Sequence, residues 1–420
     1  MKRNTLIASA ILLASCIVSV FAAQTKRPDL ESRIDSLLAV MTVDEKIGQM
    51  TQIDTVYIRS PRDIARLSIG SVFCGGGSGP SRNTPKDWAD FIDAYQKEAI
   101  SSRLGIPLLF GIDAVHGLAK VNSAVVFPHN IGMGCTRDES IVRRSGLITA
   151  RECVAIGVTW TFAPCVAVAR DERWGRTYES FGEDPDLAAS LGAASIRGYQ
   201  GEYLSGSENV LACPKHYLGD GGTVIGSGYN GLLDQGNTRI SESEMRAIHL
   251  KPYITAVRTN AMSIMASFSS LNGVKMHANG TLLNTVLKEE LGFRGFVVSD
   301  YKAIDQLAGT YEEQVAQAVN AGVDMVMVPD KYESFIVAMR ENIESGKISI
   351  TRLDDAVRRI LRAKFMMNLH DRPYANRKLL PDIGSAAHRE VAREAVRKSV
   401  VLLKNENNVL PLSPKAKTIY

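Results

Sequence analysis

Several apolar runs of this sequence end in polar or charged residues. The clearest example is the run at residues 295–299, which leads into Asp300 and Tyr301. A continuous run of small, aromatic and β-branched residues predicts a strand that is buried on both faces. A carboxylate directly after such a strand is costly to bury without a partner. Asp300 is therefore either the cap of the following helix or a residue with a chemical role.

Comparable polar residues follow other apolar runs. They are Asp113, Arg170 and Asp171, Lys215 and His216, and Ser267, Ser269 and Ser270. Glycoside hydrolysis requires two carboxylates on either side of the glycosidic bond, together with side chains that bind sugar hydroxyls. A lysine at the end of a barrel strand can instead form a Schiff base with a carbonyl substrate, so Lys215 also supports an aldolase-type lyase. From these residues alone, both chemistries stay open.

The elements that must position these residues alternate between helices and strands. Capping boxes predict helices that begin after Thr42, Thr136, Ser241 and Thr310. Apolar runs predict strands at residues 71–74, 107–112, 159–169, 210–213, 262–268, 295–299 and 324–328. This alternation predicts a parallel sheet with crossover connections.

Two α/β architectures fit that alternation. A doubly wound sheet usually has a glycine-rich phosphate-binding turn after its first strand. The glycine-rich residues 75–79 are followed by Pro80, and no acidic residue can be assigned at the distance expected for a ribose contact. A (β/α)8 TIM-like barrel fits better, and it predicts an active site built from the residues that follow the strands.

Composition excludes several classes of function. The chain is 45% hydrophobic and 22% charged, with a net charge of +4 on 420 residues and no basic tract, so we expect no nucleic-acid partner. The cysteines after the first 23 residues are Cys74, Cys135, Cys153, Cys165 and Cys213. Their odd number and scattered spacing predict free buried thiols, with one disulfide as the alternative, and no metal site.

The N-terminus predicts export from the cytoplasm. A basic stretch at residues 1–4 precedes an apolar stretch at residues 5–21 that is too short for a membrane span. Small residues favour cleavage after Ala22 or Ala23, which gives a periplasmic or extracellular protein. The alternative is a lipid anchor at Cys16, because residues 13–16 resemble a bacterial lipobox.

Longer motifs of the chain resemble glycoside hydrolase family 3, in its β-glucosidase and exo-β-glucanase branch. They are Gly-Ile-Asp-Ala-Val-His-Gly at 111–117, Phe-Pro-His-Asn at 127–130, the segment 170–185, Lys-His-Tyr at 215–217, Ser-Ser-Leu-Asn-Gly at 269–273 and Gly-Phe-Val-Val-Ser-Asp at 295–300. They follow the order of the family from about residue 35 to residue 405, which covers nearly the whole chain after the signal.

The resemblance implies a retaining, exo-acting β-glucosidase that needs no cofactor and acts on β-glucosides or β-glucan oligosaccharides. Asp300 would be the nucleophile. The residues that would bind the terminal sugar are Asp113, Arg176, Lys215, His216 and Tyr301. Tyr301 stands where the family often has a stacking Trp. Arg176 and Glu179 are also spaced for a local ion pair, which is a structural alternative for that arginine.

The proton donor is the part of the mechanism that this sequence does not display. In the N-acetylhexosaminidase branch a Pro-Gly-His-Gly motif follows the Lys-His pair, whereas here Lys215 and His216 are followed by Tyr-Leu-Gly-Asp. The resemblance therefore implies a Glu on a second α/β sandwich domain. We expect a signal peptide at 1–23, the barrel at 24–380, a linker at 381–404 and the start of a truncated second domain at 405–420. A sugar-binding fragment without turnover is the alternative.

Overall fold

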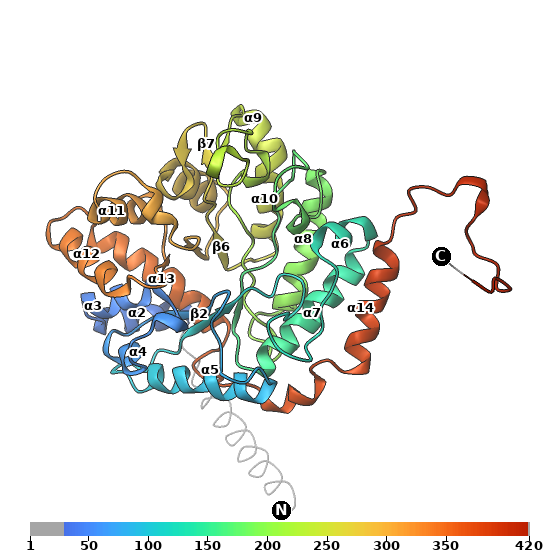
Figure 1. Cartoon of the computed structure of the whole chain (residues 1–420). Coiled ribbons are helices and arrows are strands. Elements are labelled where there is room, and N and C mark those ends of the chain that lie inside the picture. Colours follow the sequence, from blue (N-terminus) through green and yellow to red (C-terminus); the bar gives the residue numbers. More distant parts are fainter. Residues whose placement is uncertain (1–28, 419–420) are drawn as a thin grey trace, which may run out of the picture. The chain divides into compact units, whose positions relative to one another are not determined.

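The computed structural model describes residues 29–418 (Figure 1). The predicted signal peptide and the alternative lipid anchor at Cys16 lie outside the described residues. The chain divides into two compact units, Met1–Val40 and Met41–Tyr420. The described part of the first unit holds helix α2 (Leu30–Val40). Within residues 29–418, no helix is both long and apolar enough to cross a membrane.

The second unit is built on a closed ring of parallel strands. The strands are β1 (Thr51–Asp54), β2 (Ser71–Cys74), β3 (Leu109–Ile112), β4 (Trp160–Thr161), β6 (Ser263–Met265), β9 (Phe296–Val298) and β10 (Val326–Met327). Five of them form one parallel sheet in the order β10-β1-β2-β3-β4, and β6 pairs in parallel with β9. Parallel bridges close the ring: Trp160 with Leu211, Cys165 with Lys215, Tyr217 with Ala266, and Val298 with Met325. The segment 210–217 thus takes the eighth place, which confirms the predicted TIM-like barrel.

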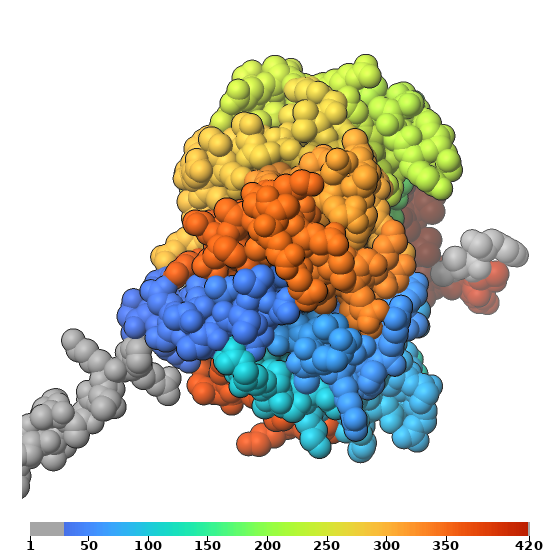
Figure 2. All heavy atoms as spheres, turned by 90° about the vertical axis from the view of Figure 1, so that its left-hand side faces the viewer, coloured from blue at the N-terminus to red at the C-terminus, as the bar shows by residue number. Residues whose placement is uncertain are grey.

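Helices surround these strands (Figure 1). They are α3 (Val43–Gln49), α4 (Arg62–Arg66), α5 (Pro85–Ile100), α6 (Asn130–Thr136), α7 (Glu139–Ala155), α8 (Pro185–Gln200), α9 (Glu242–Met245), α10 (Lys251–Arg258), α11 (Tyr311–Ala321), α12 (Tyr332–Glu344), α13 (Ile350–Met366) and α14 (Ala386–Ser399). A small sheet of β5 (Asn237–Thr238), β7 (Ser270–Leu271) and β8 (Val274–Lys275) lies outside the ring order. Figure 2 shows the start and end of the barrel side by side, in blue and orange, where α3 contacts α12 and α13.

Three of the four predicted capping boxes are confirmed. Thr42, Ser241 and Thr310 each accept a hydrogen bond from the backbone amide three residues later and receive the reciprocal contact from a Glu. The box at Thr136 is wrong, because Thr136 is the last residue of α6. Helix α7 is capped instead by Asp138, whose carboxylate accepts the amides of Ser140 and Ile141.

Strand β1 was not predicted, and the reason is its composition. Three of its four residues are polar, and two of them, Thr51 and Gln52, are fully buried. The Gln52 amide donates to the hydroxyl of Ser71 on β2 at 2.8 Å, so a neighbouring strand satisfies it. The predicted strand at 159–169 is also shorter than expected, since only Trp160–Thr161 pairs as a strand.

The described cysteines carry free thiols, as predicted. Four of them are buried, and only Cys135 is exposed. After α14, residues 400–418 contain one short 3₁₀ turn (Glu406–Asn408) and expose a run of apolar side chains from Val400 to Leu403. The assignment of this stretch to a second domain stays a prediction.

The cap of α11 offers a direct test of local stability. In Thr310→Ala the amide of Glu313 loses the hydroxyl that accepts from it at 3.3 Å, so we expect the free energy of unfolding to fall by about 1 kcal/mol. Urea denaturation measures this change. Thr310→Ser keeps the hydroxyl and serves as the control, and equal losses in both variants would contradict the role of the cap.

Candidate active site

The predicted site residues meet at the carboxyl ends of the barrel strands. Asp113 follows β3, Lys215 and His216 lie in the segment 210–217, and Asp300 follows β9. Arg176 comes from the long connection after β4, just before the 3₁₀ turn Thr177–Glu179. The hydrogen bonds described below link these residues into one cluster, at the end of the barrel where such folds place their chemistry.

The two oxygens of the Asp300 carboxylate have different environments. Oδ1 accepts the backbone N–H of Tyr301 at 2.6 Å. Oδ2 is buried and has no hydrogen-bond partner among the described residues. The backbone N–H of Asp300 donates to Nε2 of His277 at 3.1 Å, so the main chain is also held. The carboxylate is thus fixed in orientation and keeps one oxygen free.

Burial changes the acidity of Asp300. The side chain is only 12% exposed, and this burial raises the pKa of Asp300 to about 6, although Arg176, the amide of Tyr301 and Lys215 oppose the rise. The carboxyl group of Asp300 is therefore ionised at pH 7 and above. A carboxylate that is costly to bury and incompletely paired is what a nucleophile requires.

This cost should appear as a dependence of stability on pH. The pKa of Asp300 is about 6 in the folded chain, above the ordinary value of 3.8, so the folded state binds the proton more tightly. Below pH 4 the Asp300 carboxyl is protonated in both the folded and the unfolded chain, and its contribution to stability is fully present. As pH rises through 6 this contribution is lost, and the free energy of unfolding falls by an amount on the order of 3 kcal/mol. We expect Asp300→Asn to be more stable than the parent at pH 7.5 and equal to it near pH 4. Urea denaturation at both pH values measures this, and a difference that does not change with pH would contradict it.

Lys215 and Asp113 form an ion pair at the mouth of the site. The distance from Nζ to Oδ1 is 2.9 Å, with the lysine side chain 5% exposed and the Asp113 side chain 52% exposed. Burial acts to lower the pKa of Lys215, but Asp113 and Glu179 outweigh it and the pKa is raised. A protonated amine is not a nucleophile, so the geometry argues against the Schiff-base lyase.

Arg176 has two partners. Its Nε and Nη2 donate to the two oxygens of Glu179 at 2.7 and 3.0 Å, which confirms the local ion pair. Its Nη2 also lies 2.9 Å from Nε2 of His216. Burial acts to raise the pKa of Glu179, but the guanidinium outweighs burial and the pKa is lowered. The structural role of Arg176 and a role in the site are therefore compatible.

His216 is enclosed by polar partners. Its Nδ1 lies 2.8 Å from Oδ2 of Asp220, and its Nε2 lies 3.7 Å from Oδ2 of Asp300. Both ring nitrogens are engaged, by Arg176 and by Asp220, so a sugar hydroxyl would have to displace Arg176 to reach Nε2. The expected contact between His216 and a sugar hydroxyl stays a prediction.

Tyr301 lies at the edge of the cluster. The residue is 37% exposed, and its ring meets Phe73 of β2 edge to face, with ring centroids 6.2 Å apart. Nζ of Lys302 lies 5.8 Å from the centre of the Tyr301 ring. The exposed part of the ring is available to an apolar sugar face, as the sequence predicts.

Two residues of the cluster were not identified from the sequence. His277 lies 23 residues before Asp300, and no local pattern connects the two residues. Asp220 lies four residues after His216, and this spacing is the only sequence signal for their contact. No group of three or more His, Cys, Asp or Glu within residues 29–418 is placed to hold a metal ion.

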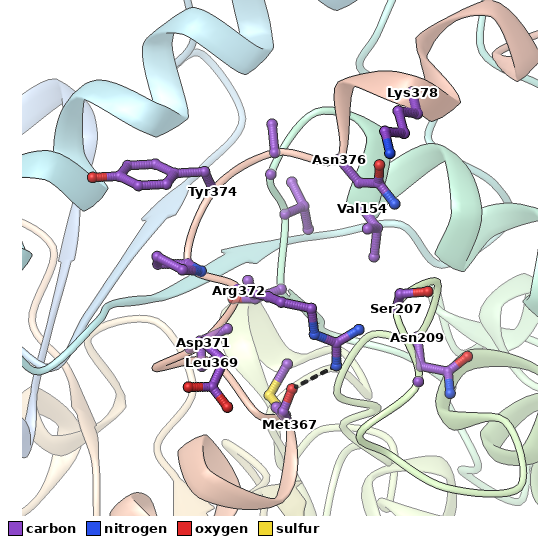
Figure 3. A pocket seen from close by; sticks show the side chains of 16 residues that line it. Val154, Ser207, Asn209, Met367, Leu369, Asp371, Arg372, Tyr374, Asn376 and Lys378 are labelled. Carbon is purple, nitrogen blue, oxygen red and sulfur yellow. Dashed lines mark hydrogen bonds between the residues drawn. The ribbon is translucent and has the colours of Figure 1, made fainter.

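A separate cavity is lined by residues that precede two of the barrel strands, and Figure 3 shows its lining. It has a volume of about 530 Å³, and its lining includes Val158 and Thr159 just before β4, Asn209 just before the segment 210–217, and Arg372 and Lys378 after α13. None of the predicted site residues lines it. Since barrel enzymes place their active sites at the carboxyl ends of the strands, we do not assign the chemistry to this cavity.

The chain is similar to several known enzymes. It is 35% identical to the lysosomal beta glucosidase of Dictyostelium discoideum, over 90% of this chain and 49% of that protein. It is also 35% identical to the periplasmic beta-glucosidase of Salmonella typhimurium, over 90% of this chain and 48% of that protein. The chain thus spans about half the length of these curated relatives.

Solved structures agree in fold. The exo-1,3/1,4-beta-glucanase of a Pseudoalteromonas species matches with 42% identity and a TM-score of 0.86, over 92% of this chain and 49% of that chain. The beta-glucosidase of Listeria innocua in complex with glucose matches with 32% identity and a TM-score of 0.80, over 91% and 53%. Residues 42–363 match the family described as glycosyl hydrolase family 3 N terminal domain. Since this match covers most of the chain, and the barrel and its rim fit it, the chain belongs to glycosyl hydrolase family 3.

Proposed function

We propose that this chain carries the nucleophile half of a retaining, exo-acting β-glucosidase that hydrolyses terminal non-reducing β-D-glucosyl residues. The observation that carries the proposal is the buried and unpartnered Oδ2 of Asp300, whose carboxylate is stabilised by the cations Arg176 and Lys215. The names of the relatives, which are β-glucosidases and an exo-glucanase, support the substrate class. A Listeria innocua relative has been solved with laminaribiose, a β-linked glucose disaccharide.

The proposed reaction has two steps. Oδ2 of Asp300 forms a bond to the anomeric carbon while the bond to the aglycone oxygen breaks, and that oxygen leaves with the electron pair and takes up a proton. Water then attacks the same carbon, gives up a proton to the group that protonated the aglycone, and releases Asp300 as its carboxylate together with the sugar. Asp113 accepts hydrogen bonds from sugar hydroxyls at the open mouth, while Lys215 and Arg176 donate to them and keep Asp300 ionised before the attack.

The proton donor is proposed to be a Glu of a second domain, as the family resemblance implies. The other carboxylates of the cluster support this view, because each already has a partner. Asp113 pairs with Lys215, Glu179 with Arg176, and Asp220 with His216. A leaving group that needs no protonation should bypass this requirement, because general acid catalysis is worth about 10² to 10⁴-fold.

The test uses 2,4-dinitrophenyl β-D-glucoside on the purified chain. We expect intact mass to show one added sugar, peptide mapping to place it on Asp300, and azide to discharge it. Absence of the adduct from a chain that circular dichroism shows to be folded would overturn the proposal. If that chain still bound glucose in calorimetry, the alternative of sugar binding without turnover would replace it.

We also propose export to the periplasm or the extracellular space. The basic and apolar character of residues 1–23 supports this, and one relative is named a periplasmic enzyme. The mass of the protein recovered from the producing cells tests it. Loss of residues 1–22 or 1–23 is the expected result, whereas a lipid on Cys16 would indicate the anchored alternative and an intact Met1 would contradict export.

A further inference from the structure

His216 forms the centre of a three-residue chain that no sequence motif predicts. Arg176 contacts Nε2 at 2.9 Å, and Asp220 contacts Nδ1 at 2.8 Å. The ring of His216 is buried at 2% exposure. Because neither ring nitrogen faces solvent, the partners alone decide which nitrogen carries hydrogen.

The partners permit one arrangement. A guanidinium has donors and no acceptor, so Nε2 of His216 must be the acceptor of the bond from Arg176. Burial, together with Arg176 and Lys215, lowers the pKa of His216 well below its usual value, so the ring is neutral. The single ring hydrogen is therefore on Nδ1 and is donated to Asp220.

Asp220 fits this role in either protonation state. Burial raises the pKa of Asp220 to about 7, against the opposing effect of Arg176. Its Oδ1 is buried and has no hydrogen-bond partner among the described residues. Oδ1 can therefore carry a proton while Oδ2 still accepts from Nδ1. A proton on Oδ2 would force the ring hydrogen onto Nε2, where it would oppose the donor of Arg176.

The position of that hydrogen matters to Asp300. Nε2 of His216 lies 3.7 Å from Oδ2 of Asp300, the oxygen without a partner. A hydrogen on Nε2 would make this nitrogen a donor, and a small rotation would bond it to that oxygen. Such a bond would stabilise the carboxylate, lower the pKa of Asp300 and weaken it as a nucleophile.

We propose that Asp220 is a positioning residue that locks His216 in the Nδ1–H tautomer and so keeps Oδ2 of Asp300 free of a hydrogen-bond donor. The benefit to catalysis rests on the proposed function, in which this oxygen is the nucleophile. Other titratable groups face the same cluster. They are Lys215 and His277 near His216, Asp113 near Asp300, and Glu179 near Asp220.

The first measurement needs no turnover. The chain is labelled with ¹⁵N-histidine, and the ring signals of His216 are assigned by their absence in His216→Gln. We expect Nδ1 protonated and Nε2 unprotonated between pH 6 and pH 8. An Nε2–H ring or an imidazolium in the parent chain would overturn the proposal, whatever the variants do.

The second measurement removes the acceptor with Asp220→Leu, a side chain of similar shape. We expect hydrogen to appear on Nε2 and the pKa of Asp300, followed by ¹³C-carboxyl signals, to fall by at least about one pH unit. The kcat for sugar transfer from 2,4-dinitrophenyl glucoside should fall about tenfold or more, with little change in KM. Persistence of the Nδ1–H ring in this variant would show that Arg176 alone sets the tautomer and would overturn the proposal.

The double variant separates the lock from a general structural effect. If Asp220 acts through His216, adding Asp220→Leu to His216→Gln leaves the pKa of Asp300 and the rate unchanged. An equal effect in both backgrounds would indicate loosened packing and would overturn the lock. If the parent shows the expected tautomer and pKa but never forms the sugar adduct, the proposed function fails while the lock stands.

Discussion

Asp300→Gly is expected to stop the transfer of sugar from 2,4-dinitrophenyl β-D-glucoside almost completely. The substitution removes Oδ2 of Asp300, which is buried without a hydrogen-bond partner, and Arg176 and Lys215 act on this carboxylate. Removal of a catalytic nucleophile elsewhere costs several orders of magnitude, so we expect a loss of at least about 10³-fold in the release of dinitrophenolate. Binding of glucose should change far less, because the groups that would hold hydroxyls remain.

Two measurements make that result specific. The matched control is Asp305→Asn, five residues further on, where the carboxylate pairs with Lys331 at 3.0 Å outside the cluster. Its rate should equal that of the parent. Azide added to Asp300→Gly should occupy the vacated space and attack the anomeric carbon as the dinitrophenolate leaves, giving the α-glucosyl azide. Rates unchanged in Asp300→Gly would remove Asp300 as the nucleophile.

Arg176→Met is expected to be among the most destabilising substitutions in the cluster. The arginine neutralises Glu179 through two hydrogen bonds, and the Glu179 side chain is largely buried. Breaking a buried ion pair from one side leaves an uncompensated charge, which costs about 3 to 5 kcal/mol. His216 would also lose the donor to Nε2. Urea denaturation of the variant measures the cost.

The charge explanation can be separated from lost packing. In Arg176→Met/Glu179→Gln no buried charge is left alone, so we expect the double variant to recover much of the lost stability. Arg173→Met is the matched control, since Arg173 pairs with Asp171 at the surface and its loss should change the free energy of unfolding little. Double and single variants of equal stability would show that the loss comes from packing.

The sequence by itself determined most of the order of elements and the position of Asp300 at the end of a strand. Residues 295–299 form a run whose composition alone predicts a buried strand, so the strand and the position of Asp300 at its end follow from the local pattern. Caps such as Thr310 are equally local, since donor and acceptor are three residues apart. Strand β1 could not be predicted in this way, because Thr51 and Gln52 are polar and become buried only in the assembled barrel. There the hydroxyl of Ser71 on β2 accepts a hydrogen bond from Gln52.

Only the tertiary structure decided the ionisation and connection of the site residues. From the sequence, Lys215 fits a Schiff-base lyase as well as a sugar-binding role, but Asp113, 102 residues away, pairs with it and raises its pKa. Arg176 and His216 are 40 residues apart, and only the folded barrel brings Arg176 to Nε2 of His216 while Asp220 contacts Nδ1. The sequence specifies the types of residue and their local order. The protonation state of each site residue depends on burial and on charges that barrel closure brings together, and no local pattern contains this information.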